Sequence, residues 1–255
     1  MGCLMKTSIE KKNDNLSLIK VIFLVFVPTT ILTAVYVLLG HVQETIPSLL
    51  LFFALALVIL FPFELAVVLR ASKKEFGNYS VRSAFANQEK PNWKKTLLYG
   101  SLLFGFAGIV SVTVGPLENL LTTPISNKLA ENIPVYFDWN NMEYLRQYQK
   151  NILLLTCVVY GVLNVFVGPV IEELYFRGYL TSRISSWGKC APVIITVLFS
   201  LYHLWLPLQN LFRICVFLPA AYIAWKEKNI YISMVFHCLC NLFSTISFII
   251  AVFTV

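Results

Sequence analysis

Seven long apolar runs limit what this chain can fold into. A helix that crosses a bilayer needs about 20 apolar residues. Within lipid every backbone polar group must be bonded inside the protein, so only helices and closed barrels cross. The runs do not alternate with the period of two that barrel strands show. The sequence therefore predicts an all-α, polytopic membrane protein with helices at about 20–39, 46–69, 96–114, 151–171, 190–206, 211–225 and 230–254.

The domain organisation follows from the same pattern. The last run is long for one span, and a break near Ser244-Thr245 would make eight helices instead of seven. The chain is 58% hydrophobic and 13% charged, whereas soluble globular chains carry about 25% charged residues. With no internal repeat or separate soluble domain, we expect a basic cytoplasmic tail at 1–19 and one transmembrane helical domain at 20–254.

The positions of lysine and arginine predict the orientation. With a cytoplasmic N-terminus and seven alternating spans, 16 of the 20 Lys and Arg residues lie on the cytoplasmic side, mainly in 70–95, 177–189 and 226–228. Cytoplasmic loops carry such an excess. The net charge of +7 is thus explained by membrane orientation, and the expected partner is the lipid bilayer, not nucleic acid.

One stretch places charged side chains at the end of the fourth apolar run: Glu172, Glu173 and, four residues later, Arg177. A charged residue at membrane depth costs about 2.5–3.5 kcal/mol on insertion scales. Glu173 and Arg177 share a helix face and should pair. Glu172 lies about 100° round the helix and is freer to act. The structural alternative is an ion pair that ends a helix at the headgroup level.

Two later runs also carry polar side chains. His203 lies in the fifth run, and His237 and Asn241, four residues apart, share a face of the seventh. The structural alternative for each histidine is a hydrogen-bonded residue inside a membrane helix. His203 lies about 13 residues into its run and His237 only about seven. For both to meet Glu172, the fifth helix must begin outside the membrane or tilt strongly.

Other polar residues of these runs are expected to have structural roles. We expect Ser200 and Tyr202 to pack and Arg213 to extend to the membrane surface. Glu64, near the end of the second run, is expected at the interface, with contact to the site as the alternative.

The chemistry that such a cluster allows is hydrolysis. Glu172 could take a proton from a water that attacks a peptide carbonyl, and His203 could share that water. His237 and Asn241 could donate hydrogen bonds to the oxyanion. Alternatively, Glu172, His203 and His237 could hold zinc with an open position for water. The sequence leaves the choice between these two open.

The three motifs together resemble a known family. Glu-Glu-x-x-x-Arg at 172–177, Phe-x-x-x-His at 199–203 and His-x-x-x-Asn at 237–241 follow in order on successive apolar runs. This arrangement is similar to the CAAX protease and bacteriocin-processing family of intramembrane proteases, also called the Abi family. The resemblance covers about 165–245, within a family-like region of about 150–250.

The resemblance implies a membrane-embedded endopeptidase whose site opens toward the cytoplasm, acting on a membrane-associated, prenylated or leader-peptide substrate. Zinc and metal-free, glutamate-dependent chemistry both stay open. The compact length and the Phe-Arg-Gly ending of the first motif look more like the bacterial branch, hence a bacterial cell membrane. By position, Glu172 and His203 would activate water and His237 and Asn241 would hold the oxyanion. The expected site residues are Glu172, Glu173, Arg177, His203, His237 and Asn241.

Two other classes of function fit parts of the pattern. A non-catalytic immunity or scaffold protein could keep the fold and bind a peptide or an enzyme. A transporter could use the same glutamates and histidines as a proton relay, although no internal repeat or pair of broken helices supports that.

Overall fold

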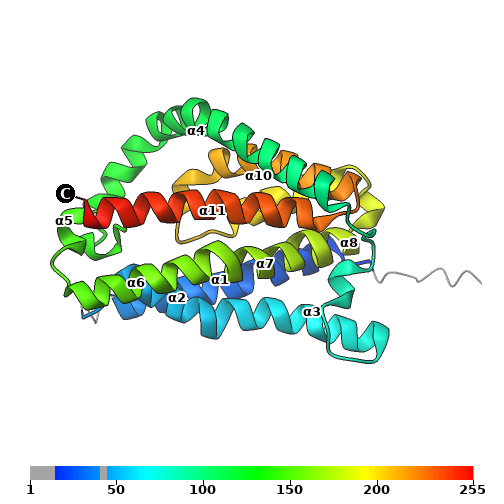
Figure 1. Ribbon diagram of the computed structural model, residues 1–255. Coiled ribbons are helices and arrows are strands. Elements are labelled where there is room, and N and C mark those ends of the chain that lie inside the picture. Colours follow the sequence, from blue (N-terminus) through cyan, green and yellow to red (C-terminus); the bar gives the residue numbers. More distant parts are fainter. Residues whose placement is uncertain (1–14, 41–44, 255) are drawn as a thin grey trace, which may run out of the picture.

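The computed structural model describes residues 15–40 and 45–254, and within them it is helical, with no strand. The all-α prediction is therefore confirmed. Most of the basic tail expected at 1–19 lies outside the described residues. Figure 1 shows the long helices running roughly side by side. The α-helices are α1 (Leu18–Gly40), α2 (Ser48–Leu55), α3 (Phe61–Phe76), α4 (Trp93–Ala130), α5 (Met142–Leu145), α6 (Lys150–Val162), α7 (Gly168–Glu172), α8 (Thr181–Arg183), α9 (Cys190–Leu201), α10 (Asn210–Lys226) and α11 (Ile230–Phe253).

Three π-helical segments join some of these into longer helices. Ala56–Leu60 links α2 to α3, Leu163–Val167 links α6 to α7, and Glu173–Leu180 links α7 to α8. Short 3-10 turns occur at Arg82–Phe85, Val135–Phe137, Ser185–Trp187 and Pro207–Gln209. Among the described residues, six continuous helices are long and apolar enough to cross a membrane.

The predicted number of spans needs one correction. All seven apolar runs form helices, but α9 has 12 residues and extends only about 18 Å at 1.5 Å per residue, short of the roughly 30 Å hydrocarbon core. The predicted fifth helix reached residue 206. The alternative of eight helices is wrong, because α11 is continuous through Ser244 and Thr245.

Tertiary contacts end α9 early. The Ser200 hydroxyl donates to the backbone carbonyl of Asn210 at 3.0 Å, and Arg213 donates to the Ser200 carbonyl at 3.1 Å. Carbonyls at a helix end need partners from outside the helix, and Arg213 of α10 provides one for Ser200. A short α9 also answers the depth question for His203, which follows the end of the helix instead of lying deep within it.

Helix α4 is longer than the predicted run at 96–114. It continues through Pro116 and Pro124 to Ala130, and Figure 1 shows it arching away from α11. Proline inside a helix removes a backbone donor and bends it. Residues 115–130 therefore add about four turns of helix beyond the predicted run. Glu118 holds this part to α10, because its two oxygens accept from the backbone N–H groups of Leu211 and Phe212 at 2.7 and 2.8 Å.

The two ends of the bundle differ in charge. The segments 70–95, 177–189 and 226–228, rich in Lys and Arg, lie at the right-hand end in Figure 1, which we call the basic end. The α4–α6 connection, with α5, and the C-terminus lie at the opposite end, which we call the open end.

Candidate active site

Glu173 is the centre of a buried cluster at the start of the third π segment, Glu173–Leu180. Its side chain is fully buried, and its Oε1 lies 3.2 Å from Arg177 Nη1 and 3.1 Å from His237 Nδ1. The Arg177 guanidinium lies 4.1 Å from the centre of the Phe199 ring and 5.5 Å from that of Phe217. None of the guanidinium nitrogens makes a hydrogen bond of good geometry to a described residue. Charge pairing and cation–π contact hold it instead. The predicted Glu173–Arg177 pair is confirmed.

Glu172 is the carboxylate that lines a large cavity within the bundle. It is 8% exposed, and its Oε1 accepts a hydrogen bond from the Tyr202 hydroxyl at 2.7 Å. Its Oε2 lies 3.6 Å from His237 Nε2. The two ring nitrogens of His237 therefore face the two glutamates, one each. A carboxylate held on two sides has a fixed direction, which general-base chemistry requires.

The expectation that Tyr202 only packs is wrong. Tyr202 is fully buried, follows directly after α9, and its backbone carbonyl accepts a hydrogen bond from Thr29 of α1. Thr29 thereby fixes the turn from which the hydroxyl reaches Glu172. Ser200 likewise does more than pack, because it ties the end of α9 to α10.

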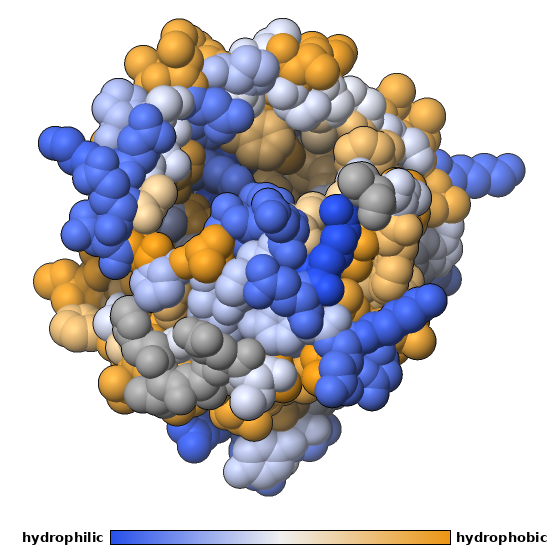
Figure 2. All heavy atoms as spheres, turned by 90° about the vertical axis from the view of Figure 1, so that its left-hand side faces the viewer, coloured by the Kyte–Doolittle hydropathy of each residue, from blue (hydrophilic) through white to orange (hydrophobic). Residues whose placement is uncertain are grey.

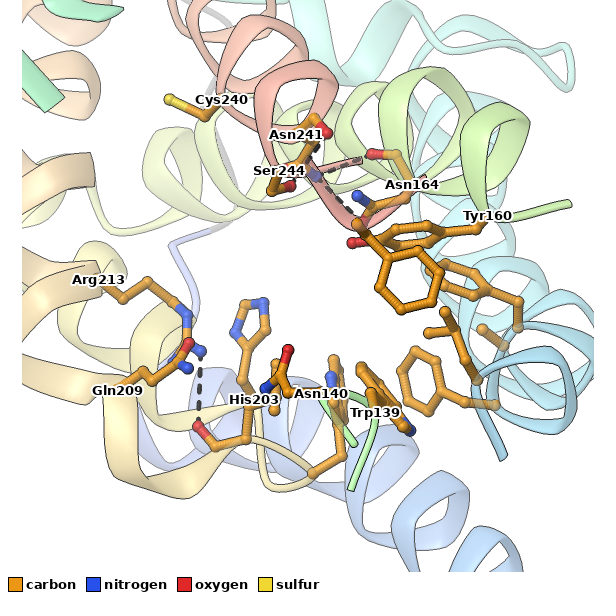
Figure 3. A pocket seen from close by; sticks show the side chains of 18 of the residues that line it. Trp139, Asn140, Tyr160, Asn164, His203, Gln209, Arg213, Cys240, Asn241 and Ser244 are labelled. Carbon is orange, nitrogen blue, oxygen red and sulfur yellow. Dashed lines mark hydrogen bonds between the residues drawn. The ribbon is translucent and has the colours of Figure 1, made fainter. Parts of the chain in front are cut away.

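His203 presents one ring nitrogen to the cavity. Its Nδ1 lies 2.8 Å from the Phe199 carbonyl. A carbonyl can only accept, so Nδ1 carries the proton in this contact and Nε2 is left as the acceptor in the neutral ring. Figure 3 shows the imidazole of His203 pointing into the open space. His203 and Glu172 line the same cavity.

Asn241 is held on another side of the same cavity. Its Nδ2 donates to the Asn164 backbone carbonyl at 2.8 Å, with a longer contact of 3.4 Å to Asn164 Oδ1. Asn164 lies in the second π segment, Leu163–Val167, and donates to Thr245 at 3.0 Å. Figure 3 shows the Asn241–Asn164 pair apart from His203 and Arg213. The amide is thus engaged by Asn164, a residue that the motifs did not reveal.

Two expectations about outlying charges are wrong. Arg213 does not extend to the membrane surface: it is 7% exposed and lines the cavity with its guanidinium. Glu64 is not interfacial: it is fully buried on α3 and lies close enough to Glu172 and Tyr202 to interact electrostatically with both. The hydrogen bond of Tyr202 goes to Glu172, and neither oxygen of Glu64 has a hydrogen-bond partner among the described residues.

The structure contains one large cavity of about 1220 Å³, which several of the expected site residues line. Most of its wall is apolar and aromatic, and its polar groups include Glu172, His203, Arg213, His237 and Asn241. It is also lined by residues of the α4–α6 connection, from Asn132 to Met142, at the open end of the bundle. Figure 2, which looks at that end, shows the molecule hollowed there.

The position of the mouth conflicts with one part of the sequence analysis. A cytoplasmic N-terminus puts the basic end in the cytoplasm, whereas a cytoplasmic site needs the open end there. The structure places the cavity mouth at the end opposite to the Lys- and Arg-rich segments. The two expectations cannot both hold, because hydropathy and charge counting show where Glu172 lies along its helix but not from which end it is reached.

The zinc alternative does not fit the arrangement of the side chains. Within residues 15–40 and 45–254, no group of three or more His, Cys, Asp and Glu residues is placed to hold a metal ion. The set Glu172, His203 and His237 is therefore not gathered round one point. His237 directs its two nitrogens to two different glutamates.

Comparison with known proteins agrees with the motif resemblance. Residues 154–243 match the family model described as "Type II CAAX prenyl endopeptidase Rce1-like". No curated protein and no solved structure matches the chain. The matched segment runs from α6 into α11 and includes all six expected site residues. The match confirms the resemblance over that segment, and it indicates a membrane protease.

Proposed function

We propose that this protein is an intramembrane endopeptidase in which Glu172 activates a water molecule without a metal ion. The match of residues 154–243 to a prenyl endopeptidase family supports the reaction class. The observation that carries the mechanism is the convergence of Tyr202 and His237 on Glu172, which lines the cavity, with the buried pair of Glu173 and Arg177 behind them.

In the first step, water lies between Glu172 and Nε2 of His203. Glu172 takes one proton from the water. At the same time the water oxygen bonds to the carbonyl carbon of the substrate. The carbonyl π electrons move to the oxygen, which becomes an oxyanion. The Tyr202 hydrogen bond keeps the carboxylate directed toward the water, and the mostly apolar wall strengthens these interactions by excluding other water.

The oxyanion needs donors, and Asn241 can provide one. Its amide carries two N–H groups: Asn164 accepts at 2.8 Å through its backbone carbonyl and more weakly, at 3.4 Å, through its side chain. The oxyanion would replace the weaker of these contacts, and His237 Nε2, which lies 3.6 Å from Glu172, is the neighbouring donor on α11. Such a donor contributes about 2.7–4 kcal/mol in a dry site. Glu172 then returns its proton to the leaving nitrogen as the C–N bond breaks, which gives a carboxylic acid and an amine.

The substrate class follows from the shape of the site. An unfolded peptide segment can enter from the open end, and aromatic and aliphatic side chains can accept its apolar residues or an attached isoprenoid chain. We propose a membrane-associated peptide, prenylated or carrying a leader, as the substrate. The membrane face from which the substrate approaches depends on the orientation of the protein in the membrane.

The test is peptide hydrolysis by the purified full-length protein in detergent. Quenched prenylated and leader-type peptides are incubated with the wild type, with Glu172→Gln and with Glu143→Gln. Glu143 is exposed on α5 and outside the cavity lining, so it controls for the loss of one carboxylate. We expect cleavage by the wild type and by Glu143→Gln, and a loss of at least about 10²-fold in Glu172→Gln, as expected for removing a general base.

Two outcomes would contradict the proposal. Undiminished cleavage by Glu172→Gln would remove the glutamate from the reaction. Activity that a chelator abolishes and zinc restores would contradict the metal-free step. If wild type cleaves no peptide and a cellular phenotype survives Glu172→Gln, the scaffold alternative becomes the better description.

A further inference from the structure

Arg213 is a buried cation that forms no ion pair within residues 15–40 and 45–254. It is 7% exposed, and among the described residues no carboxylate lies within ion-pair distance of it, although the other buried arginines, Arg177 and Arg183, have one each. Its contacts are neutral: the carbonyl of Ser200 at 3.1 Å, the Asn210 side chain at 3.4 Å and the carbonyl of Leu206 at 3.5 Å. A charge at membrane depth is costly unless it is paired or functional.

The nearest acidic groups are engaged elsewhere. Both oxygens of Glu118 are bound to the backbone N–H groups at the start of α10, and Glu172 accepts from Tyr202. Glu172 and Glu118 attract Arg213 through space, but neither carboxylate contacts its guanidinium. Glu118 holds the first turn of α10 against α4, and that turn carries the guanidinium toward the cavity.

The guanidinium is accessible from the cavity. Arg213, Gln209 and His203 lie on one side of it in Figure 3, facing Asn164 and Asn241 across the open space. A guanidinium has five N–H donors in a planar fork that matches a carboxylate. Its protein contacts, two of them long, use only part of that capacity.

We propose that Arg213 forms a carboxylate-binding subsite beside the reacting groups, and that the substrate provides its missing counter-ion. The carboxylate is either the free C-terminus of the peptide or an acidic side chain near it. Binding there would fix the peptide in register, so that cleavage falls at a set distance from the carboxylate. This inference rests on the proposed peptidase function only in taking a peptide as the ligand, and binding can be measured without hydrolysis.

The structural alternative is that Arg213 only satisfies the carbonyls at the end of α9. In that case, replacing Arg213 would change the affinity for all peptides equally. A carboxylate subsite predicts a difference between peptides that differ only in charge.

The experiment measures binding to full-length protein in nanodiscs in the Glu172→Gln background, where hydrolysis is blocked. The probes are three fluorescent farnesylated peptides: one with a free C-terminal carboxylate, its C-terminal amide, and the amide with aspartate as its last residue. The protein carries Arg213, Arg213→Gln or Arg213→Lys. Arg146→Gln is the matched control, since Arg146 also donates to backbone carbonyls, at 2.9 and 3.5 Å, but lies outside the cavity lining.

With Arg213 we expect the free carboxylate to bind about tenfold tighter than the amide, a typical gain for a charge-assisted contact. The preference should vanish in Arg213→Gln, be partly kept in Arg213→Lys and persist in Arg146→Gln. Rescue of binding by the aspartate peptide would assign the subsite to any carboxylate, and no rescue would assign it to the C-terminus. Equal binding of the first two peptides with Arg213 present, or a preference that survives Arg213→Gln, would overturn the proposal. A preference that depends on Arg213 would support the subsite whether or not the wild type cleaves, so the subsite and the peptidase can fail separately.

Discussion

At the scale of single residues, the hydroxyl of Tyr202 is the most direct control on Glu172. Tyr202→Phe removes the 2.7 Å hydrogen bond and leaves the ring in place. A hydrogen bond to a charged group contributes about 1.5–3 kcal/mol, so we expect kcat to fall about 10- to 100-fold, with KM little changed. Steady-state kinetics in detergent measure this.

A double substitution tells whether Tyr202 acts through Glu172. In the Glu172→Gln background, Tyr202→Phe should cause little further loss of residual activity, because the hydrogen-bond acceptor is already altered. A full additional loss would mean that the hydroxyl contacts the substrate on its own account.

The Glu173–Arg177 pair is expected to matter for stability. Arg177→Met leaves Glu173 as an uncompensated buried charge, which costs about 3–5 kcal/mol. Thermal unfolding of the purified protein should show this as a clearly lower Tm. Glu173→Gln combined with Arg177→Met removes both charges and should recover part of the loss, and a double variant less stable than Arg177→Met would contradict this account.

The residues of the site were predictable to different degrees. The Glu173–Arg177 pair followed from helix spacing alone, because both partners lie on one helix. Tyr202, Asn164 and Arg213 escaped prediction because their roles depend on contacts between distant parts of the chain: Tyr202 with Glu172, Asn164 with Asn241, and Arg213 with the end of α9. A tyrosine or asparagine in an apolar run gives no sign of its partner.

At the scale of elements, the π segment Glu173–Leu180 depends on close contact with the loop after α3. A Cβ added to Gly178 would lie 2.7 Å from the carbonyl oxygen and 2.8 Å from the Cβ of Ala84. Since the backbone of the 3-10 turn Arg82–Phe85 would have to move, we expect Gly178→Ala to destabilise the protein by about 1–3 kcal/mol. Thermal unfolding checks this.

Gly161 on α6 is the matched control. An added Cβ there meets nothing within 4 Å, and alanine is the better helix former by about 1 kcal/mol. Gly161→Ala should therefore leave the Tm unchanged or raise it. Equal losses in both variants would show that the contact with Ala84 is not the cause.

The elements themselves were largely predictable, and the exceptions have a common origin. Hydropathy identified every long helix, because membrane burial acts on the whole run. It placed the ends of α4 and α9 wrongly, since it gives no sign of contacts between elements, such as those of Glu118 with α10 and of Arg213 with the end of α9. Hydropathy alone likewise gave no sign of the π segments.

At the scale of the whole molecule, the basic and open ends should face opposite sides of the membrane. Cys190, exposed at the start of α9, lies near the basic end, and Asn140 lies at the cavity mouth. In a background without the other cysteines, a membrane-impermeant maleimide should label Cys190 from the cytoplasmic side and Asn140→Cys from the other side, as the excess of Lys and Arg predicts.

The reversed labelling pattern would place the cavity mouth in the cytoplasm and overturn the orientation inferred from charge. Labelling of both positions from one side would contradict the arrangement of the helices itself.

The depth of the cavity has a consequence for what this protein can attack. Glu172 lies 22 residues after the start of α6 at Lys150, about 33 Å along the helix, and the mouth is at the end where α6 begins. If Glu172 is the reacting group, as proposed, a folded domain entering from the open end would be too wide to reach it, whereas a loose strand or a chain end could be threaded inward. Under that function, the looseness of a chain would select substrates before any side chain is recognised.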